Sequence, residues 1–186
     1  MAAPRRRIYL AGWATLLGMG GLGWVIMTYV HKLSPFAILP HSPEQALYQT
    51  GVGIVYAFLT TRLLLVLLER TSMDAARSFF GNLLRRFRMR PVDIWFISFC
   101  AGFGEELLFR GALQPWLGIW ITAVVFVALH GYLDPFNRPI LGYGIFMVLV
   151  CAGFGYLTDH IGLWSASVAH MGIDIVLMNY LLKKSR

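Results

Sequence analysis

The eight residues GEELLFRG, Gly104–Gly111, decide how this chain is interpreted, because they place two glutamates and an arginine inside an apolar segment. A charged side chain in the hydrocarbon core of a membrane costs roughly 2.5 to 3.5 kcal/mol on insertion scales. Two further stretches repeat the pattern: FVALH, 126–130, ends on a histidine, and HMGID, 170–174, begins with a histidine and ends on an aspartate. Ionisable groups kept at such a cost indicate a functional site.

The composition is that of a membrane protein with several spans. The chain has 186 residues, of which 58% are hydrophobic and 13% charged, and its mean hydropathy is +0.63. Soluble domains usually carry about 25% charged residues. The formal net charge of +7 indicates a membrane surface rather than nucleic acid, because the basic residues cluster at the ends of apolar runs.

We expect an all-α fold with about six transmembrane helices forming one membrane domain. Apolar runs of sufficient length lie near residues 8–30, 48–68, 92–110, 116–131, 139–158 and 162–182. The first run is too long for the apolar part of a signal peptide, so it is expected to be a retained span. Segment 69–91 combines apolar residues at helical spacing with arginines, which predicts a basic amphipathic helix on an anionic membrane surface. A solvated connector is the alternative for that segment.

The distribution of basic residues predicts the orientation of the chain. With six spans and the N-terminus inside, 13 of the 16 basic residues fall on the cytoplasmic side. They are Arg5, Arg6, Arg7, Arg70, Arg77, Arg85, Arg86, Arg88, Arg90, Arg138, Lys183, Lys184 and Arg186. The positive-inside rule therefore places both termini in the cytoplasm. The membrane is expected to be a bacterial cytoplasmic membrane, with the endoplasmic reticulum as the alternative.

The two adjacent glutamates are expected to have different roles. Glu105 and Glu106 point about 100° apart on a helix. Arg110 follows Glu106 by four residues, a spacing at which a glutamate and an arginine form a favourable ion pair. We therefore expect Glu106 and Arg110 to hold the helix in register and Glu105 to be free for chemistry.

The remaining polar residues are His130, His170 and Asp174. His170 and Asp174 are four residues apart and share one helix face. A carboxylate beside a histidine is the arrangement that activates water, which favours a catalytic or metal site over a proton pathway or structural polar contacts. Depth does not follow from the spacing alone. Glu105 lies about 20 Å into its span at 1.5 Å per residue, whereas His130 lies near the cytoplasmic end of the next one.

The three motifs resemble those of the CPBP family, which includes type II CAAX prenyl endopeptidases and bacterial Abi-like proteins. GEELLFRG is similar to the family's E-E-x-x-x-R motif, 126–130 to F-x-x-x-H, and 170–174 to H-x-x-x-N or H-x-x-x-D. The resemblance covers about residues 92–182 and leaves 1–91, two spans and the basic helix, outside the catalytic core. It implies an intramembrane endopeptidase acting on a membrane-anchored or lipid-modified protein, with no cofactor favoured.

The resemblance also implies roles for individual residues. Glu105 is the general base, His130 shares the nucleophilic water, His170 and Asp174 bind or support the oxyanion, and Glu106 and Arg110 are structural. An aspartate donates a hydrogen bond to an oxyanion only when it is protonated, so we expect Asp174 to orient His170 instead.

Three alternatives remain open for the function. The first is a zinc-dependent version of the same protease, with Glu105, His130 and His170 as metal ligands. The second is a non-catalytic immunity or scaffolding protein of the same fold. The third is a proton-coupled transporter that uses the same polar residues as a relay.

Overall fold

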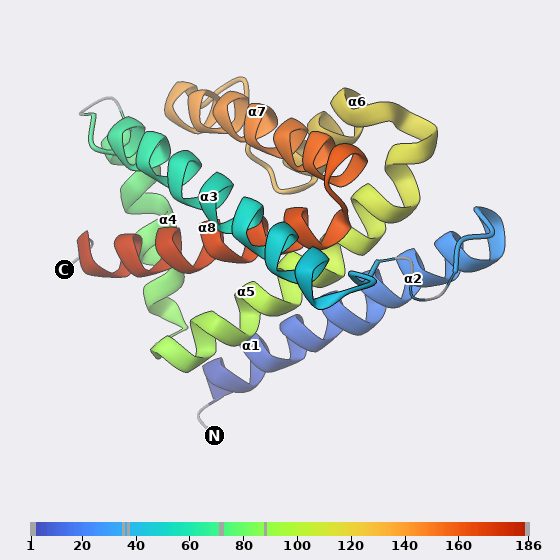
Figure 1. The fold of residues 1–186 in the computed structure, drawn as a ribbon. Coiled ribbons are helices and arrows are strands. Elements are labelled where there is room, and N and C mark those ends of the chain that lie inside the picture. The colour runs from blue at the N-terminus through green and yellow to red at the C-terminus, as the bar shows by residue number, and fades with distance from the viewer. Residues whose placement is uncertain (1–2, 35, 37, 71–72, 88, 185–186) are drawn as a thin grey trace.

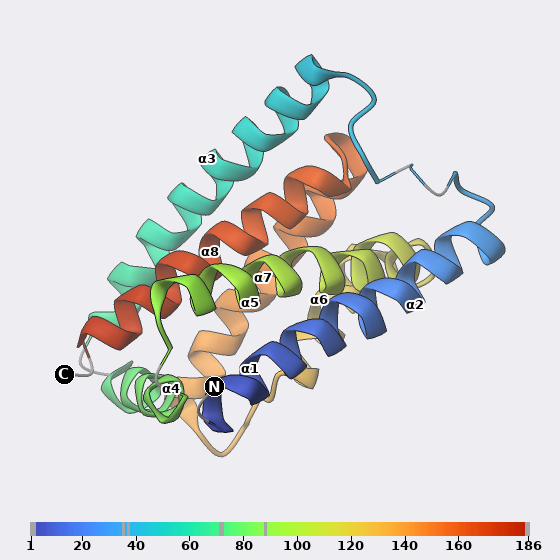
Figure 2. The ribbon, with the colours of Figure 1, turned by 90° about the horizontal axis from the view of Figure 1, so that it is seen from below.

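The structure is a computed structural model that describes residues 3–34, 36, 38–70, 73–87 and 89–184. Within these residues the fold is all-α, as predicted. Long helices run side by side, and a shorter helix crosses one end of the bundle (Figures 1 and 2). The described helices include five stretches long and apolar enough to cross a membrane, which confirms a polytopic membrane protein.

The first span is one continuous helical rod, as expected for residues 8–30. Its four consecutive segments are α1 (Ala3–Trp13), the π-helical η1 (Ala14–Met19), α2 (Gly20–Val25) and the π-helical η2 (Ile26–Val30). The rod lies along α5 (Pro91–Glu106) and the π-helical segment η4 (Leu107–Leu113) that continues it. A Cβ atom on Gly104 would lie 2.6 Å from the carbonyl oxygen of Thr15. Glycine therefore allows the two backbones to touch.

The predicted bounds of the other long spans differ only slightly from the observed ones. Helix α3 (Pro43–Leu68) begins five residues before the predicted start. The Oγ atom of Ser42 accepts a hydrogen bond from the backbone N–H of Gln45, and Pro43 suits the first helical turn. Helices α7 (Arg138–His160) and α8 (Leu163–Lys184) begin and end within two residues of the prediction.

The predicted boundary between a third span at 92–110 and a fourth span at 116–131 is wrong. Helix α6 (Gln114–Leu129) follows α5 and η4 with no loop between them, so that one apolar stretch of 39 residues replaces the two predicted spans. A straight helix of this length would extend about 58 Å, roughly twice the hydrocarbon core. The stretch instead breaks inside α6, where Gly118 has φ 73° and ψ 169°. A positive φ strains any residue with a Cβ, so glycine permits the chain to reverse there.

Helix α8 lies between α3 and α5 and forms the centre of the bundle (Figures 1 and 2). Its first half is lined with small buried residues: Ser165, Ala166, Ser167 and Ala169. Glycines of the neighbouring helices face this half, because a Cβ on Gly53 or Gly102 would lie within 2.7 Å of α8 carbonyl oxygens. Small residues thus bring three helices into backbone contact, as is common in membranes.

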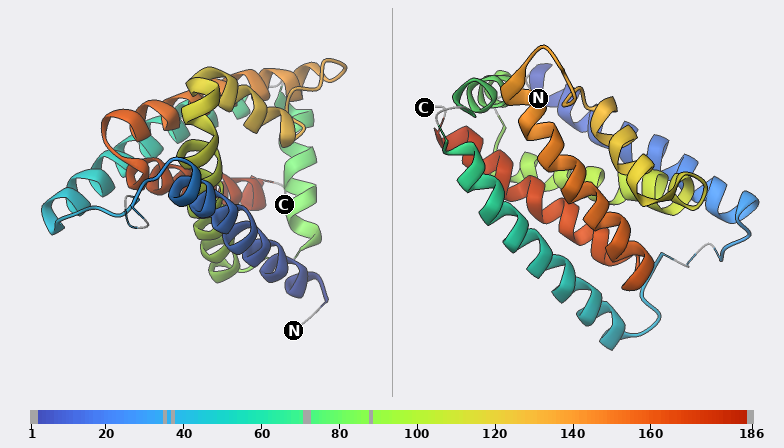
Figure 3. Two further views of the ribbon diagram at one scale, coloured as in Figure 1. Left: turned by 90° about the vertical axis from the view of Figure 1, so that its right-hand side faces the viewer. Right: turned by 90° about the horizontal axis from the view of Figure 1, so that it is seen from above.

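The amphipathic helix predicted in segment 69–91 is confirmed as α4 (Asp74–Arg86). It crosses one end of the bundle, beside the beginning of α7 (Figure 3). The beginning of α1 and the end of α8 lie at that same end (Figure 1). Arg5 of α1 pairs with Asp93 there, and Lys184 of α8 pairs with Glu69. Two of the basic residues assigned to this end, Arg88 and Arg186, lie outside the described residues.

Candidate active site

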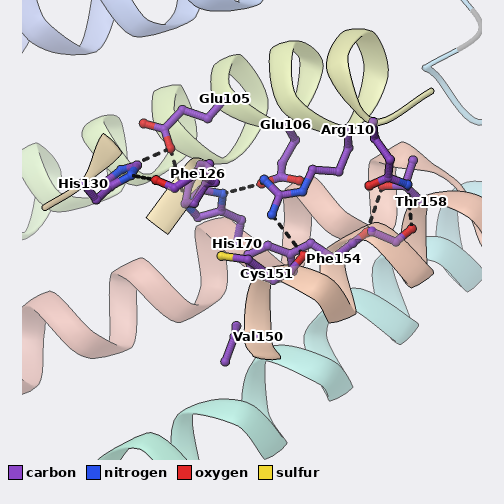
Figure 4. A network of polar contacts seen from close by, with 12 residues as sticks. Glu105, Glu106, Arg110, Phe126, His130, Val150, Cys151, Phe154, Thr158 and His170 are labelled. Carbon is purple, nitrogen blue, oxygen red and sulfur yellow. Dashed lines mark hydrogen bonds and ion pairs between the residues drawn. The ribbon is translucent and has the colours of Figure 1, made fainter. Parts of the chain in front are cut away.

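Four of the six polar side chains singled out in the sequence meet at one point between α5, α6 and α8. The Oε2 atom of Glu105 lies 3.8 Å from Nε2 of His130 and 3.9 Å from Nε2 of His170. The Oδ2 atom of Asp174 lies 3.8 Å from the same nitrogen of His170. Glu105 extends toward both histidines (Figure 4). Three motifs that are distant in the sequence therefore form one site.

The chain reversal at Gly118 brings His130 to the depth of Glu105. Gly118 lies 13 residues after Glu105 and 12 residues before His130. At 1.5 Å per residue the chain therefore advances about 20 Å from Glu105 and returns about 18 Å to His130. The mismatch in depth expected from two full spans disappears, because the returning part of α6 is only about half a span long.

The orientation of His130 follows from its backbone neighbour. Its Nδ1 atom lies 2.8 Å from the carbonyl oxygen of Phe126. A carbonyl oxygen only accepts hydrogen bonds, so Nδ1 carries the proton and donates. The neutral imidazole thus presents an unprotonated Nε2 atom toward Glu105.

Glu106 connects the two parts of the site. Its Oε1 atom accepts hydrogen bonds from Nη1 of Arg110 at 3.0 Å and from Nδ1 of His170 at 2.8 Å. The Nη2 atom of Arg110 also donates to the carbonyl oxygen of Cys151 at 3.0 Å. Glu106 and Arg110 are almost fully buried. Figure 4 shows Glu106 between the arginine and the histidine.

This contact between Glu106 and His170 is the feature that sequence reasoning missed. The sequence assigned Asp174, four residues away, to orient His170. In the structure the hydrogen-bonded carboxylate is Glu106, whereas Asp174 lies at 3.8 Å from the other ring nitrogen. No sequence signal indicates a contact between residues 64 positions apart, because it depends on how α5 crosses α8.

Aromatic rings hold the buried charges in place. The ring of Phe154 stacks on His170 with centroids 5.3 Å apart and an interplanar angle of 14°. The guanidinium of Arg110 lies 4.8 Å from the ring centre of Phe126 and 5.4 Å from that of Phe154. Such rings stabilise a desolvated cation. Phe126 belongs to the second sequence motif, whereas Phe154 lies in an apolar run with no distinguishing signal.

The four converging residues line a cavity of about 280 Å³. Glu105, His130, His170 and Asp174 supply its polar wall. Most of the other lining side chains are apolar and come from six helices, α3 to α8, with Leu68, Phe80, Ile97, Phe126, Met147 and Leu177 among them. Thr15 of η1 lines the cavity as well, so the N-terminal rod contributes to its wall. A few polar side chains in the wall of an otherwise apolar cavity are typical of a ligand-binding site.

Glu105 and His130 present two hydrogen-bond acceptors that face each other. The Oε2 atom of Glu105 is buried and forms no hydrogen bond with any described residue. Across 3.8 Å it faces the unprotonated Nε2 atom of His130. Two acceptors at this separation can both receive hydrogen bonds from one water molecule, whose heavy-atom distances would be about 2.8 Å. The site is therefore suited to activating water by general base catalysis.

The zinc alternative sets a geometric requirement for Glu105, His130 and His170. A shared zinc ion would require ligand atoms at about 2.0 to 2.2 Å from one point. Among the residues that the structure describes, no group of three histidine, cysteine, aspartate or glutamate side chains could hold a metal ion. The only described cysteines, Cys100 and Cys151, are buried and unpaired with each other.

Comparison with known proteins gives two matches. A model of the type II CAAX prenyl endopeptidase Rce1-like family matches residues 87–176, which include all six polar residues of the site. An uncharacterized protein of Bacillus subtilis (strain 168), YpbD, is 33% identical over 86 residues. That match covers 45% of this chain and 42% of the relative, so this chain spans less than half of the relative's length. No solved structure is a significant match.

Proposed function

We propose that this protein is an intramembrane endopeptidase, because residues 87–176 match a model of the type II CAAX prenyl endopeptidase Rce1-like family. It hydrolyses a peptide bond in a membrane-anchored or lipid-modified protein. The observation that carries the proposal is the pair of facing acceptors, Oε2 of Glu105 and Nε2 of His130, at 3.8 Å on the wall of an apolar cavity. A single glutamate in a transmembrane helix would lack the second acceptor that orients the water.

In the proposed mechanism, Glu105 is the general base. It takes a proton from a water molecule that is also hydrogen-bonded to His130, and the resulting oxygen attacks the scissile carbonyl carbon. The proton held by Glu105 then passes to the leaving amine. Because the Oε2 atom of Glu105 is buried, its interaction with the reacting water is only weakly screened by bulk solvent.

His170 is the proposed donor to the developing oxyanion. Its Nδ1 atom donates to Glu106, which fixes the ring, and its Nε2 atom faces the cavity. In the protonated ring Nε2 donates a hydrogen bond, which stabilises negative charge in the transition state. Asp174 lies 3.8 Å from Nε2 and favours that protonated form.

The proposed substrate and location follow from the cavity and the charges. The cavity lies near the arginine-rich end of the bundle, since α4 residues form part of its wall. By the positive-inside rule this end faces the cytoplasm, so both termini are cytoplasmic. The apolar wall suits a substrate segment close to its membrane anchor. The proposed location is a bacterial cytoplasmic membrane, in which anionic head groups lie beside the basic residues.

The proposed reaction needs no metal ion. The test is elemental analysis of the protein after gentle purification, together with its activity after treatment with a chelator. We expect no stoichiometric zinc and no loss of activity. Stoichiometric zinc that is lost together with activity would contradict this part of the proposal.

The main experiment compares protein termini in membranes of cells that produce the wild-type protein or an equally abundant Glu105→Ala variant. Quantitative terminal-peptide proteomics should detect new protein ends only with the wild type, and these ends identify the substrate. Glu69→Ala is the matched control, because Glu69 is an exposed carboxylate that does not line the cavity. The same ends in wild type and Glu105→Ala membranes would refute the proposal and favour a non-catalytic binding protein.

A further inference from the structure

Helix α4 has two different faces, and one of them closes the cavity. Phe80, Leu83 and Leu84 of α4 line the cavity that also contains the catalytic residues. Arg85 and Arg86, in the last turn of the same helix, are exposed. Figure 3 shows α4 lying across the ends of the long helices. The helix is thus at once part of the cavity wall and part of the surface.

A chain of aromatic contacts joins α4 to His130. The ring centroid of Phe80 lies 5.4 Å from that of Tyr132 and 5.1 Å from that of Tyr143. Tyr132 in turn lies 5.5 Å from the ring of His130. A displacement of α4 therefore removes the contact that supports Tyr132, and Tyr132 is the ring beside the histidine.

The surface around α4 is strongly basic. Exposed basic residues at this end are Arg6, Arg7, Arg70, Arg85, Arg86, Arg90, Arg138, Lys183 and Lys184. The nearby acidic residues are already engaged: Glu69 pairs with Lys184, Asp74 with Arg77, and buried Asp93 with Arg5 and Arg90. Asp134 accepts a hydrogen bond within its own loop. Within the described residues, no carboxylate pairs with Arg85 or Arg86.

Exposed apolar side chains lie beside these arginines. Phe79 and Leu83 of α4 are 55% and 43% exposed. Apolar side chains next to arginines are typical of a surface that sits in the head-group region of a membrane. Because a guanidinium fork matches the oxygens of a phosphate group, the complementary partner is an anionic phospholipid.

We propose that α4 is a sensor of anionic phospholipids for the active site. Arg85 and Arg86 bind the phosphate groups of anionic lipids and hold α4 over the cavity. Phe80 and Tyr132 transmit this position to His130, so Tyr132 is a positioning residue. The inference rests on the proposed protease function and adds its regulation: cleavage increases with the anionic lipid content of the membrane.

The test uses the full-length protein in vesicles of phosphatidylcholine, alone or in an equimolar mixture with phosphatidylglycerol. The first readout is the enrichment of phosphatidylglycerol in the lipid that copurifies with the protein, which is independent of activity. The second is the rate of Glu105-dependent cleavage of a substrate identified from its new ends. We expect the wild type to enrich phosphatidylglycerol and to cleave faster in the mixed vesicles.

Arg85→Gln/Arg86→Gln is the first variant. We expect its enrichment of phosphatidylglycerol to fall by about five-fold for each arginine, and its cleavage to be equally slow in both kinds of vesicle. Arg6→Gln/Arg7→Gln is the matched control, because it removes the same charge from the same end of the bundle but not from α4. The control should keep the lipid response of cleavage.

Phe80→Ala separates lipid binding from its effect on the site. It should enrich phosphatidylglycerol like the wild type and lose the response of cleavage. Phe80→Leu, which keeps more of the apolar contact, guards against a misfolded alanine variant and should retain part of the response.

Several results would overturn the inference. An undiminished response of cleavage to phosphatidylglycerol in Arg85→Gln/Arg86→Gln or in Phe80→Ala would do so. Equal cleavage by the wild type in both kinds of vesicle would also overturn it, but would leave the protease function intact. Restoration of the response in pure phosphatidylcholine by soluble polyglutamate would assign the surface to an acidic protein partner instead. The absence of Glu105-dependent cleavage in every lipid would refute the protease function itself.

Discussion

Glu106→Gln tests whether Glu106 acts on His170 or only supports the helix. The substitution keeps the size of the side chain and an oxygen that can accept from Arg110 and from His170, but it removes the negative charge. A hydrogen bond to a charged group contributes about 1.5 to 3 kcal/mol, and a neutral one about 1 kcal/mol. The loss at His170 is therefore about 0.5 to 2 kcal/mol. If this difference appears in the transition state, cleavage per folded molecule falls about 2- to 30-fold.

The assay measures the release of the new protein ends per folded molecule, with folded protein quantified by size-exclusion chromatography in detergent. Arg110→Lys is the matched comparison. It keeps a cation beside Glu106 and leaves the bond from Glu106 to His170, but it loses the fork that also reaches the carbonyl oxygen of Cys151. We expect Arg110→Lys to lower the amount of folded protein while cleavage per folded molecule stays near that of the wild type.

A cleavage rate per folded molecule that is unchanged in Glu106→Gln would refute this reasoning. It would show that the 2.8 Å contact with His170 is structural and that another group fixes the catalytic ring. Equal losses of rate in Glu106→Gln and Arg110→Lys would also contradict it, because only the first substitution changes the partner of His170.

Asp174, Gly104 and His130 each allow a separate test. Asp174→Asn and Asp174→Ala should both lower cleavage, because each removes the negative charge 3.8 Å from Nε2 of His170; wild-type cleavage in Asp174→Asn would show that this charge is not needed. Gly104→Ala should lower the thermal unfolding midpoint, at a cost of about 1 to 3 kcal/mol, because its Cβ would lie 2.6 Å from the Thr15 carbonyl oxygen. Gly21→Ala, with no atom within 4 Å, should not; equal midpoints would contradict the close contact. His130→Ala should abolish most cleavage, because it removes the Nε2 atom that faces Oε2 of Glu105 at 3.8 Å; cleavage at the wild-type rate would contradict the shared water.

The spans and the identity of the polar residues could be predicted from the sequence because they depend on local properties. A run of apolar residues has no stable place except in a membrane or a core, and Arg138–His160 or Leu163–Lys184 is long enough to be recognised without knowing its neighbours. Glu105 is conspicuous for the complementary reason, since an ionisable group in an apolar run is costly. The arginines of α4 likewise indicated an amphipathic helix before its position was known.

The reversal at Gly118 could not be predicted in the same way. The chain has 19 glycines, and most of them lie in helices where they allow close contact rather than a turn. Whether a glycine adopts a positive φ depends on the helices packed around it. The apolar run therefore appeared as two full spans, and the equal depth of Glu105 and His130 was not visible.

Composition and residue spacing are properties of single segments, so they are enough to predict an all-helical membrane protein. They also identify its buried polar residues: Glu105, Glu106, Arg110, His130, His170 and Asp174. Which of these groups touch depends on how the helices pack. The bond from His170 to Glu106, the facing acceptors of Glu105 and His130, and the closure of the cavity by α4 arise between segments distant in the chain. Helix crossing sets such contacts, and crossing depends on the fit of small residues along whole helix faces.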